Sequence, residues 1–247
     1  LIWREPNTIS IKNIRNYIND VVLTYPYLGS KLWDIILQMA AVPNHPLNAE
    51  WLHEHLMKFT MADRDAWWTI WLKRNYSSNS TIGKVIQWGF DTECNDPETI
   101  KLISIALAWF HTSTNRELRD RSTKALIFLL NRRIDILIDI LIMFEEVDDP
   151  YVLERLYAVA YGCVLQNAYT VEHFSSLVNY IYSTVFDKDE VYPHVLLRDY
   201  ARNTIEYYVY KGNVIDFPIE KIRPPYKSEF NFKALTNEEL DKKYSPG

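Results

Sequence analysis

Apolar residues recur along most of the chain at the three- and four-residue spacing of an amphipathic α-helix. No segment shows a convincing two-residue alternation, which a half-buried strand would produce. We therefore predict an all-α protein. The predicted helices span residues 8–24, 30–41, 48–60, 62–75, 81–90, 97–111, 115–130, 133–146, 150–166, 171–186 and 193–211.

Residues that favour helix starts support several of these boundaries. Two predicted helices begin with an aspartate followed by a proline, which places a capping carboxylate before a residue that needs no backbone donor. Asn48 can cap the helix that follows it, and Thr114 with Glu117 forms a capping-box pattern. The aspartate–proline pairs are Asp96-Pro97 and Asp149-Pro150.

One apolar face recurs in three predicted helices, 115–130, 150–166 and 193–211. In each helix, apolar or small residues stand at positions i, i+4, i+7, i+8, i+11 and i+12. The three sets start at Leu118, Val152 and Leu197. The first set includes the polar residue Ser122, and the third set includes Thr204. The starting positions differ by 34 residues (152 − 118) and 45 residues (197 − 152).

A further amphipathic helix lies between each pair of these helices. One helix pair every 34 to 45 residues is typical of HEAT, armadillo or tetratricopeptide-like repeats. We predict stacked antiparallel helix pairs in an irregular, HEAT/armadillo-like α-solenoid with an extended C-terminal tail. An irregular helical bundle is the alternative.

The chain divides into three predicted parts. Residues 1–112 form a Trp-rich helical subdomain, 113–212 the helical-repeat segment, and 213–247 an extended strap or linker that Ile219, Ile222, Phe230 and Phe232 could anchor. The first residue is Leu1 rather than Met, which suggests a segment of a longer protein. The first part contains Trp33, Trp51, Trp67, Trp68, Trp71, Trp88 and Trp109.

Composition argues against several classes of site. Only 6 glycines are present, and Ser78 stands where a phosphate loop ending in Thr81-Ile82-Gly83-Lys84 needs its first glycine. The net charge is −5 without a basic block, so nucleic-acid binding is disfavoured. Neither a signal peptide nor a membrane span is visible, and Cys94 and Cys163 show no paired spacing. We expect a cytoplasmic protein without a cofactor in this segment.

The histidines and acidic residues offer limited chemistry. His53 and His55 are two positions apart on a helix and point in different directions, so we predict two partly exposed histidines rather than metal ligands. Asp135 and Asp139 share a helix face near Glu145, which leaves open an all-α enzyme with a carboxylate-lined pocket. The simpler interpretation is the solvent side of an amphipathic helix.

The candidate interaction surface combines charged and aromatic residues. Dense charge around position 120 indicates either a salt-bridge network or a contact with another domain, and an exposed tryptophan beside basic residues could stack on single-stranded nucleic acid. Core packing is the better interpretation of the Trp cluster around residue 68. The candidate surface residues are Arg119, Arg121, Arg155, Trp68, Lys73 and Arg74.

Four segments resemble a known family: HPLNAEWLH at 45–53, MADRDAWW at 61–68, RDRSTKAL at 119–126 and DPYVLERLYAVAYG at 149–162. Together they resemble the helical region that follows the ATPase module in large bacterial STAND-class NTPases, including those of antiviral defence. The resemblance covers roughly residues 40–170.

The resemblance implies a multidomain parent protein. In this family an N-terminal effector precedes the NTPase, C-terminal helical repeats sense a viral protein, and target binding drives oligomerisation. None of the family's ATP-binding or effector residues maps onto this chain. The segment would therefore be a non-catalytic scaffold or sensor that binds neighbouring domains or a viral protein.

Overall fold

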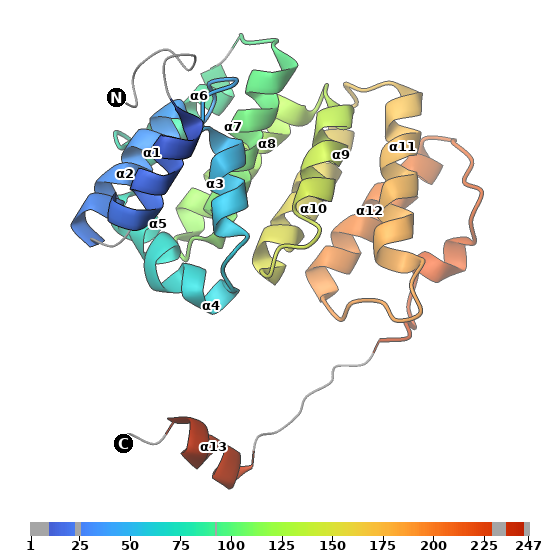
Figure 1. Cartoon of the computed structure of the whole chain (residues 1–247). Helices are drawn as coiled ribbons and strands as arrows, with labels where there is room; N and C mark the ends of the chain where they lie inside the picture. Colours follow the sequence, from blue (N-terminus) through green and yellow to red (C-terminus); the bar gives the residue numbers. More distant parts are fainter. Residues whose placement is uncertain (1–9, 23–25, 92, 229–235, 245–247) are drawn as a thin grey trace.

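The computed structural model describes residues 10–22, 26–91, 93–228 and 236–244, and all regular structure in these ranges is helical, as predicted (Figure 1). No helix in these ranges combines the length and apolar composition needed to cross a membrane. The α-helices are α1 (Ile11–Tyr17), α2 (Pro26–Met39), α3 (Ala49–Leu56), α4 (Met61–Arg64), α5 (Ile70–Asn75), α6 (Thr81–Asp91), α7 (Pro97–Trp109), α8 (Arg116–Leu130), α9 (Ile134–Met143), α10 (Pro150–Leu165), α11 (Val171–Ile181), α12 (Val195–Tyr210) and α13 (Asn237–Tyr244).

Shorter helical turns extend several of these helices. Turns of π-helix follow α1, α4 and α11, and turns of 3-10 helix follow α7 and precede the C-terminal tail. The π turns are η2 (Ile18–Val22), η3 (Asp65–Thr69) and η5 (Tyr182–Phe186), and the 3-10 turns are η4 (Phe110–Thr112) and η6 (Ile219–Ile222).

The helices stack in two rows. Along one row α6, α8, α10 and α12 contact one another in order, and along the other α3, α7, α9 and α11 do so. Contacts between α7 and α8, α9 and α10, and α11 and α12 join the two rows (Figure 1). The prediction of stacked helices is therefore confirmed, whereas the HEAT/armadillo-like class and the domain boundaries stay predictions.

The predicted repeated face forms the core of the first row. Of its eighteen positions in α8, α10 and α12, only Val209 is not buried, with 39% of its surface exposed. The face is therefore turned away from solvent and into the core of the stack. Its buried members are Leu118, Ser122, Ala125, Leu126, Leu129, Leu130, Val152, Leu156, Val159, Ala160, Cys163, Val164, Leu197, Ala201, Thr204, Ile205 and Tyr208.

Three of the predicted helix caps are confirmed and one is wrong. The side chain of Asn48 accepts hydrogen bonds from the backbone of α3, and Asp96 and Asp149 cap α7 and α10 in the same way. Thr114 does not cap α8. The cap is Asn115, whose side chain accepts from the Leu118 amide at 3.3 Å, so the helix begins one residue later than the capping box requires.

A π turn interrupts the Trp-rich helix predicted over 62–75, because Asp65–Thr69 form η3 between α4 and α5. Trp68, Trp71 and Leu72 are buried at the i, i+3 and i+4 spacing of one helix face, and Trp68 and Trp71 stack at 5.6 Å. Trp67 is half-buried and Ile70 is 39% exposed. Core packing of the Trp cluster, the favoured prediction, is therefore confirmed.

Residues 213–228 pack against the last helix pair. The ring of Phe217 stacks on Tyr182 of η5 at 3.7 Å, and the guanidinium of Arg198 on α12 lies 4.7 Å from the Tyr226 ring. Ile222 is buried and Ile219 is partly buried against the core, so two predicted anchors are in place, while Phe230 and Phe232 lie outside the described residues. Helix α13 follows those residues and was not predicted.

Burial shifts the pKa of three histidines, of which His53 is half-buried, as predicted. His55 is only 7% exposed and stacks on Trp51 at 5.1 Å, so the prediction that it is partly exposed is wrong. His53 is half-buried against Phe144, and His111 is fully buried. Burial lowers the pKa of His53 and of His55 to about 4, and burial with the nearby arginine charges lowers the pKa of His111 to about 3.

Gly83 is required by a close backbone approach, because a Cβ there would overlap the carbonyl oxygens of Ser77 and Ser78. We expect Gly83→Ala to lower the free energy of unfolding by about 2 kcal/mol, because the turn before α6 must move. Urea unfolding measures the change. Lys84→Ala alters the exposed next residue and should change stability by less than about 0.5 kcal/mol. Equal stability of the two variants would contradict the proposed overlap.

We expect stability to fall between pH 7 and pH 5. The folded-state pKa values of the three histidines lie below the unfolded value of about 6.5, so protons bind the unfolded chain more readily in this window. The stabilisation that the three neutral histidines contribute to folding is complete above about pH 6.5. It is lost towards about pH 4, at up to about 1.4 kcal/mol per pH unit for each histidine. Urea titrations at several pH values measure it. His53→Gln should reduce the slope and His173→Gln, at an exposed position, should not.

Candidate interaction surface

An ion pair joins two helices of the first row. The Nη1 atom of Arg155 on α10 donates to Asp120 Oδ1 on α8 at 2.9 Å, and both side chains are partly buried. Asp120 also lies 3.5 Å from Arg116, whose side chain is 87% exposed. One carboxylate therefore accepts two guanidinium groups, and the contact with Arg155 crosses the interface between neighbouring helices.

The same set of contacts continues to α12 through Glu154. Its carboxylate is buried and lies 3.8 Å from Arg155 Nε and 3.6 Å from His194 Nε2. His194 caps α12, because its Nδ1 atom accepts from the Leu197 amide at 3.3 Å. The tautomer with hydrogen on Nε2 satisfies both contacts. Polar contacts thus run from α8 through α10 to α12.

The other two predicted surface arginines are also used within the chain. Arg121 on α8 donates to Gln87 Oε1 on α6 at 3.4 Å. This contact is equivalent to that of Arg155 with α8, one helix pair earlier in the row. Arg119 donates to the Ser113 carbonyl oxygen, and its guanidinium lies 5.3 Å from the Tyr151 ring of α10. The sequence left open a salt-bridge network or a contact with another domain for the charged residues around position 120. In the structure these residues form a polar network between helices.

Trp68 does not belong to any surface, so its place in the predicted interaction surface is corrected. Its ring is fully buried, and its Nε1 atom donates to Thr112 Oγ1 at 3.1 Å beside Trp109. Stacking of this ring on a nucleic-acid base is therefore excluded. Lys73 and Arg74 are exposed at the end of α5.

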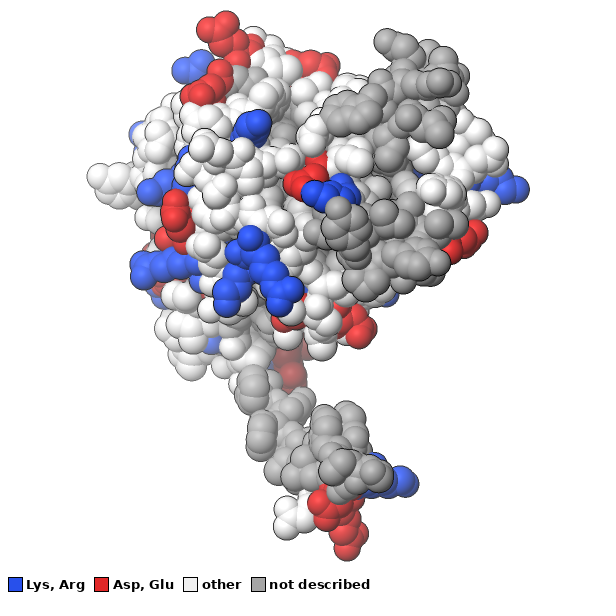
Figure 2. All heavy atoms as spheres, turned by 90° about the vertical axis from the view of Figure 1, so that its left-hand side faces the viewer, with Lys and Arg blue, Asp and Glu red and all other residues white. Residues whose placement is uncertain are grey.

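Charge on the visible face does not form a continuous basic area. Figure 2 shows a small group of basic side chains with acidic side chains on either side. With a net charge of −5, this distribution gives no electrostatic support to the nucleic-acid alternative.

The carboxylates considered for an enzyme do not converge on a pocket. Asp135 and Asp139 are exposed on α9, and Asp139 pairs with Lys101 of α7 at 3.2 Å. Glu145 is also exposed. Within the described ranges, no group of three His, Cys, Asp or Glu side chains is arranged to hold a metal ion. Asp135 and Asp139 thus mark the solvent side of an amphipathic helix, whereas Glu145 lines a separate pocket that neither of them reaches.

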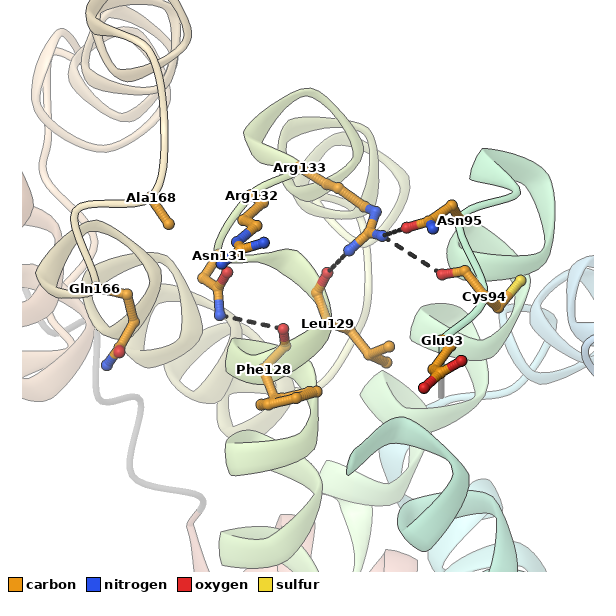
Figure 3. Close-up of a pocket in the computed structure, with 10 residues that line it drawn as sticks. All are labelled: Glu93, Cys94, Asn95, Phe128, Leu129, Asn131, Arg132, Arg133, Gln166 and Ala168. Atoms are coloured by element: carbon orange, nitrogen blue, oxygen red, sulfur yellow. Dashed lines mark hydrogen bonds between the residues drawn. The ribbon is translucent and has the colours of Figure 1, made fainter. Parts of the chain in front are cut away.

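A groove lies across the turns at one end of the stack (Figure 3). It has a volume of about 490 Å³ and is open on one side. It crosses the α6–α7 loop, the α8–α9 turn and the α10–α11 turn, so it touches three successive connections between the two rows. We call it the turn groove; its residues are 93–95, 128–129, 131–133, 166 and 168.

Two adjacent arginines of the turn groove differ in their surroundings. Arg133 donates to the Leu129 carbonyl oxygen at 2.9 Å, to Asn95 Oδ1 at 2.9 Å and to the Cys94 carbonyl oxygen at 3.4 Å (Figure 3). These neutral acceptors hold its guanidinium without neutralising its charge. Arg132 is exposed and makes no hydrogen bond or ion pair with the described residues. The sequence analysis did not single out either residue.

We expect a double-mutant cycle on Arg155 and Asp120 to yield a coupling energy of about 1 kcal/mol, because their ion pair is partly shielded from water. Urea unfolding of Arg155→Ala, Asp120→Ala and the double variant measures it. The control is the cycle on Arg116 and Asp120, where the arginine is exposed and the coupling should stay below about 0.5 kcal/mol. Equal couplings would show that the contact between helices adds no more to stability than the exposed pair.

No protein-family model matches this chain, and no curated protein and no solved structure is significantly similar to it. The resemblance to STAND-class NTPases therefore stays a prediction.

Proposed function

We propose that this chain is a non-catalytic helical scaffold or sensor segment that binds protein partners or neighbouring domains. The observation that carries the proposal is the burial of one repeated face in α8, α10 and α12, which lie in order along a single row. A row of this kind leaves the turns at its ends and the outer faces of its helices free across several units. Extended surfaces of this type suit protein recognition.

The proposed mechanism is mechanical. Binding of a partner across several helix pairs stabilises the arrangement of helices and attached domains that fits the partner best. The ion pair of Arg155 with Asp120 and the contact of His194 with Glu154 connect neighbouring helices. A displacement of one helix is therefore transmitted to the next helix in the row.

The parent protein is proposed from the resemblance described above. We propose a larger cytoplasmic, multidomain protein of the STAND-class NTPase type, in which this segment contacts the NTPase module or a viral protein and supports oligomerisation. What supports this is the likeness of residues 45–53, 61–68, 119–126 and 149–162 to that family. In this proposal ATP binding and effector activity belong to other domains.

Site-specific photo-crosslinking tests the proposal. A photoreactive residue replaces exposed Lys124 on α8 or exposed Gln166 in the α10–α11 turn, and Lys73 on α5 serves as the comparison site. We expect discrete protein adducts, identified by mass spectrometry, in the full-length protein that carries this chain. A parallel anisotropy titration with a 12-nucleotide single-stranded DNA should show no binding. Absence of any protein adduct at Lys124 and Gln166, adducts no stronger there than at Lys73, or tight DNA binding would overturn the proposal.

A further inference from the structure

We propose that the turn groove binds an acidic peptide segment of a protein partner, an inference that rests on the proposed function. The groove is elongated across three successive turns rather than enclosed, which suits an extended chain better than a compact small molecule. Its charge, the end of one helix and its apolar side chain each point to this occupant.

The charged side chains favour a carboxylate ligand. Arg132 and Arg133 line the groove, and Glu93 is the single carboxylate among the residues that do so. The charge of Arg133 is held in place by neutral oxygens, and the exposed guanidinium of Arg132 has no partner among the described residues. Guanidinium groups bind carboxylates through two parallel hydrogen bonds, which the exposed side chain of Arg132 can offer. Arg133 uses Nη2 for Asn95 and Cys94, so it contributes its positive charge rather than a second bidentate contact.

The helix that starts at this groove lacks a side-chain cap. Helices α7, α9 and α11 all start at this end of the second row, and Asp96 and Thr170 cap α7 and α11. The corresponding residue of α9 is Arg133, which makes no capping hydrogen bond. The partial positive charge of this helix start lies beside the two arginines, and the exposed carboxylate of Asp135 in the first turn of α9 offsets part of it.

The remaining groove residues suit a peptide. Phe128 is 52% exposed at the edge of the groove, where it can contact an apolar side chain next to an acidic one. The amide side chains of Asn131 and Gln166 can both donate to and accept from a peptide backbone. An acidic residue flanked by apolar residues therefore matches the groove in charge and in shape.

Fluorescence anisotropy with labelled decapeptides tests the proposal on the full chain. The probes are a peptide of alternating Asp and Leu, the same peptide with Lys in place of Asp, and the same peptide with phosphoserine in place of Asp, each with an amidated C-terminus. A fourth probe has Ser in place of Asp and a free C-terminal carboxylate. We expect the Asp–Leu peptide to bind most tightly, and amide chemical shifts of residues 128–133 and 166–168 to change on binding.

Charge-changing variants locate the binding site. We expect Arg132→Glu to weaken binding of the Asp–Leu peptide by about tenfold or more, and Glu93→Gln to strengthen it about two- to threefold. Lys124→Glu makes the same charge change on exposed α8 outside the groove and should alter affinity by less than about twofold. Thermal unfolding confirms that each variant is folded. We expect all three variants to fold, because all three positions are exposed.

The outcomes separate this proposal from the proposed function. Equal weakening by Arg132→Glu and Lys124→Glu, or equal binding of the Asp and Lys peptides, would overturn the groove proposal. So would preference for the phosphoserine peptide or for the terminal carboxylate alone. If protein adducts still form at Lys124 or Gln166 in those cases, the scaffold function stands and only the acidic-peptide site is wrong.

Discussion

Close packing of α6 against α8 and of α8 against α10 is the constraint on which the rest of the structure depends. Small residues permit it. A Cβ on Gly162 would overlap the side chain of Ile127, and one on Gly89 would lie 3.1 Å from the Cβ of Ala125. Neighbouring helices can therefore approach closely, and the apolar face between them is excluded from water. This burial provides the main favourable free energy for ordering the row.

Polar side chains are placed where this packing brings helices together. Arg121 and Arg155 occupy the same position in successive units and reach the preceding helix, to Gln87 and to Asp120. The third unit has Tyr200 there, whose ring lies 6.5 Å from that of Tyr161. Each side chain thus fills the same contact between helices with different chemistry. A partly buried ion pair gains modest energy but strongly disfavours a shift in register, because separation would leave charges unpaired.

Sequence periodicity was sufficient for the helices and for the repeated face, since both depend on local spacing. Core packing of the Trp cluster was also predicted, and Trp68, Trp71 and Leu72 are buried at regular helical spacing. The π turn at Asp65–Thr69 was not predicted, because no local pattern indicates it. Periodicity also could not place His55, which is buried by residues distant in sequence, Trp33 among them. The turn groove was missed because its arginines belong together only once three turns are side by side.

The two ends of the first row differ in electrostatics, and this difference separates structural charge from charge available to a partner. Near the starts of α8, α10 and α12, charged side chains lie in ion-pair contact with one another: Arg155 with Asp120 and Glu154, and Glu154 with His194. At the opposite end, where α8 and α10 finish, Arg132 has no partner among the described residues, and the guanidinium of Arg133 contacts only neutral oxygens. A ligand at the first end must displace existing ion pairs, whereas one at the turn groove adds contacts without breaking any. Recognition of an acidic partner is therefore least costly at the turn groove.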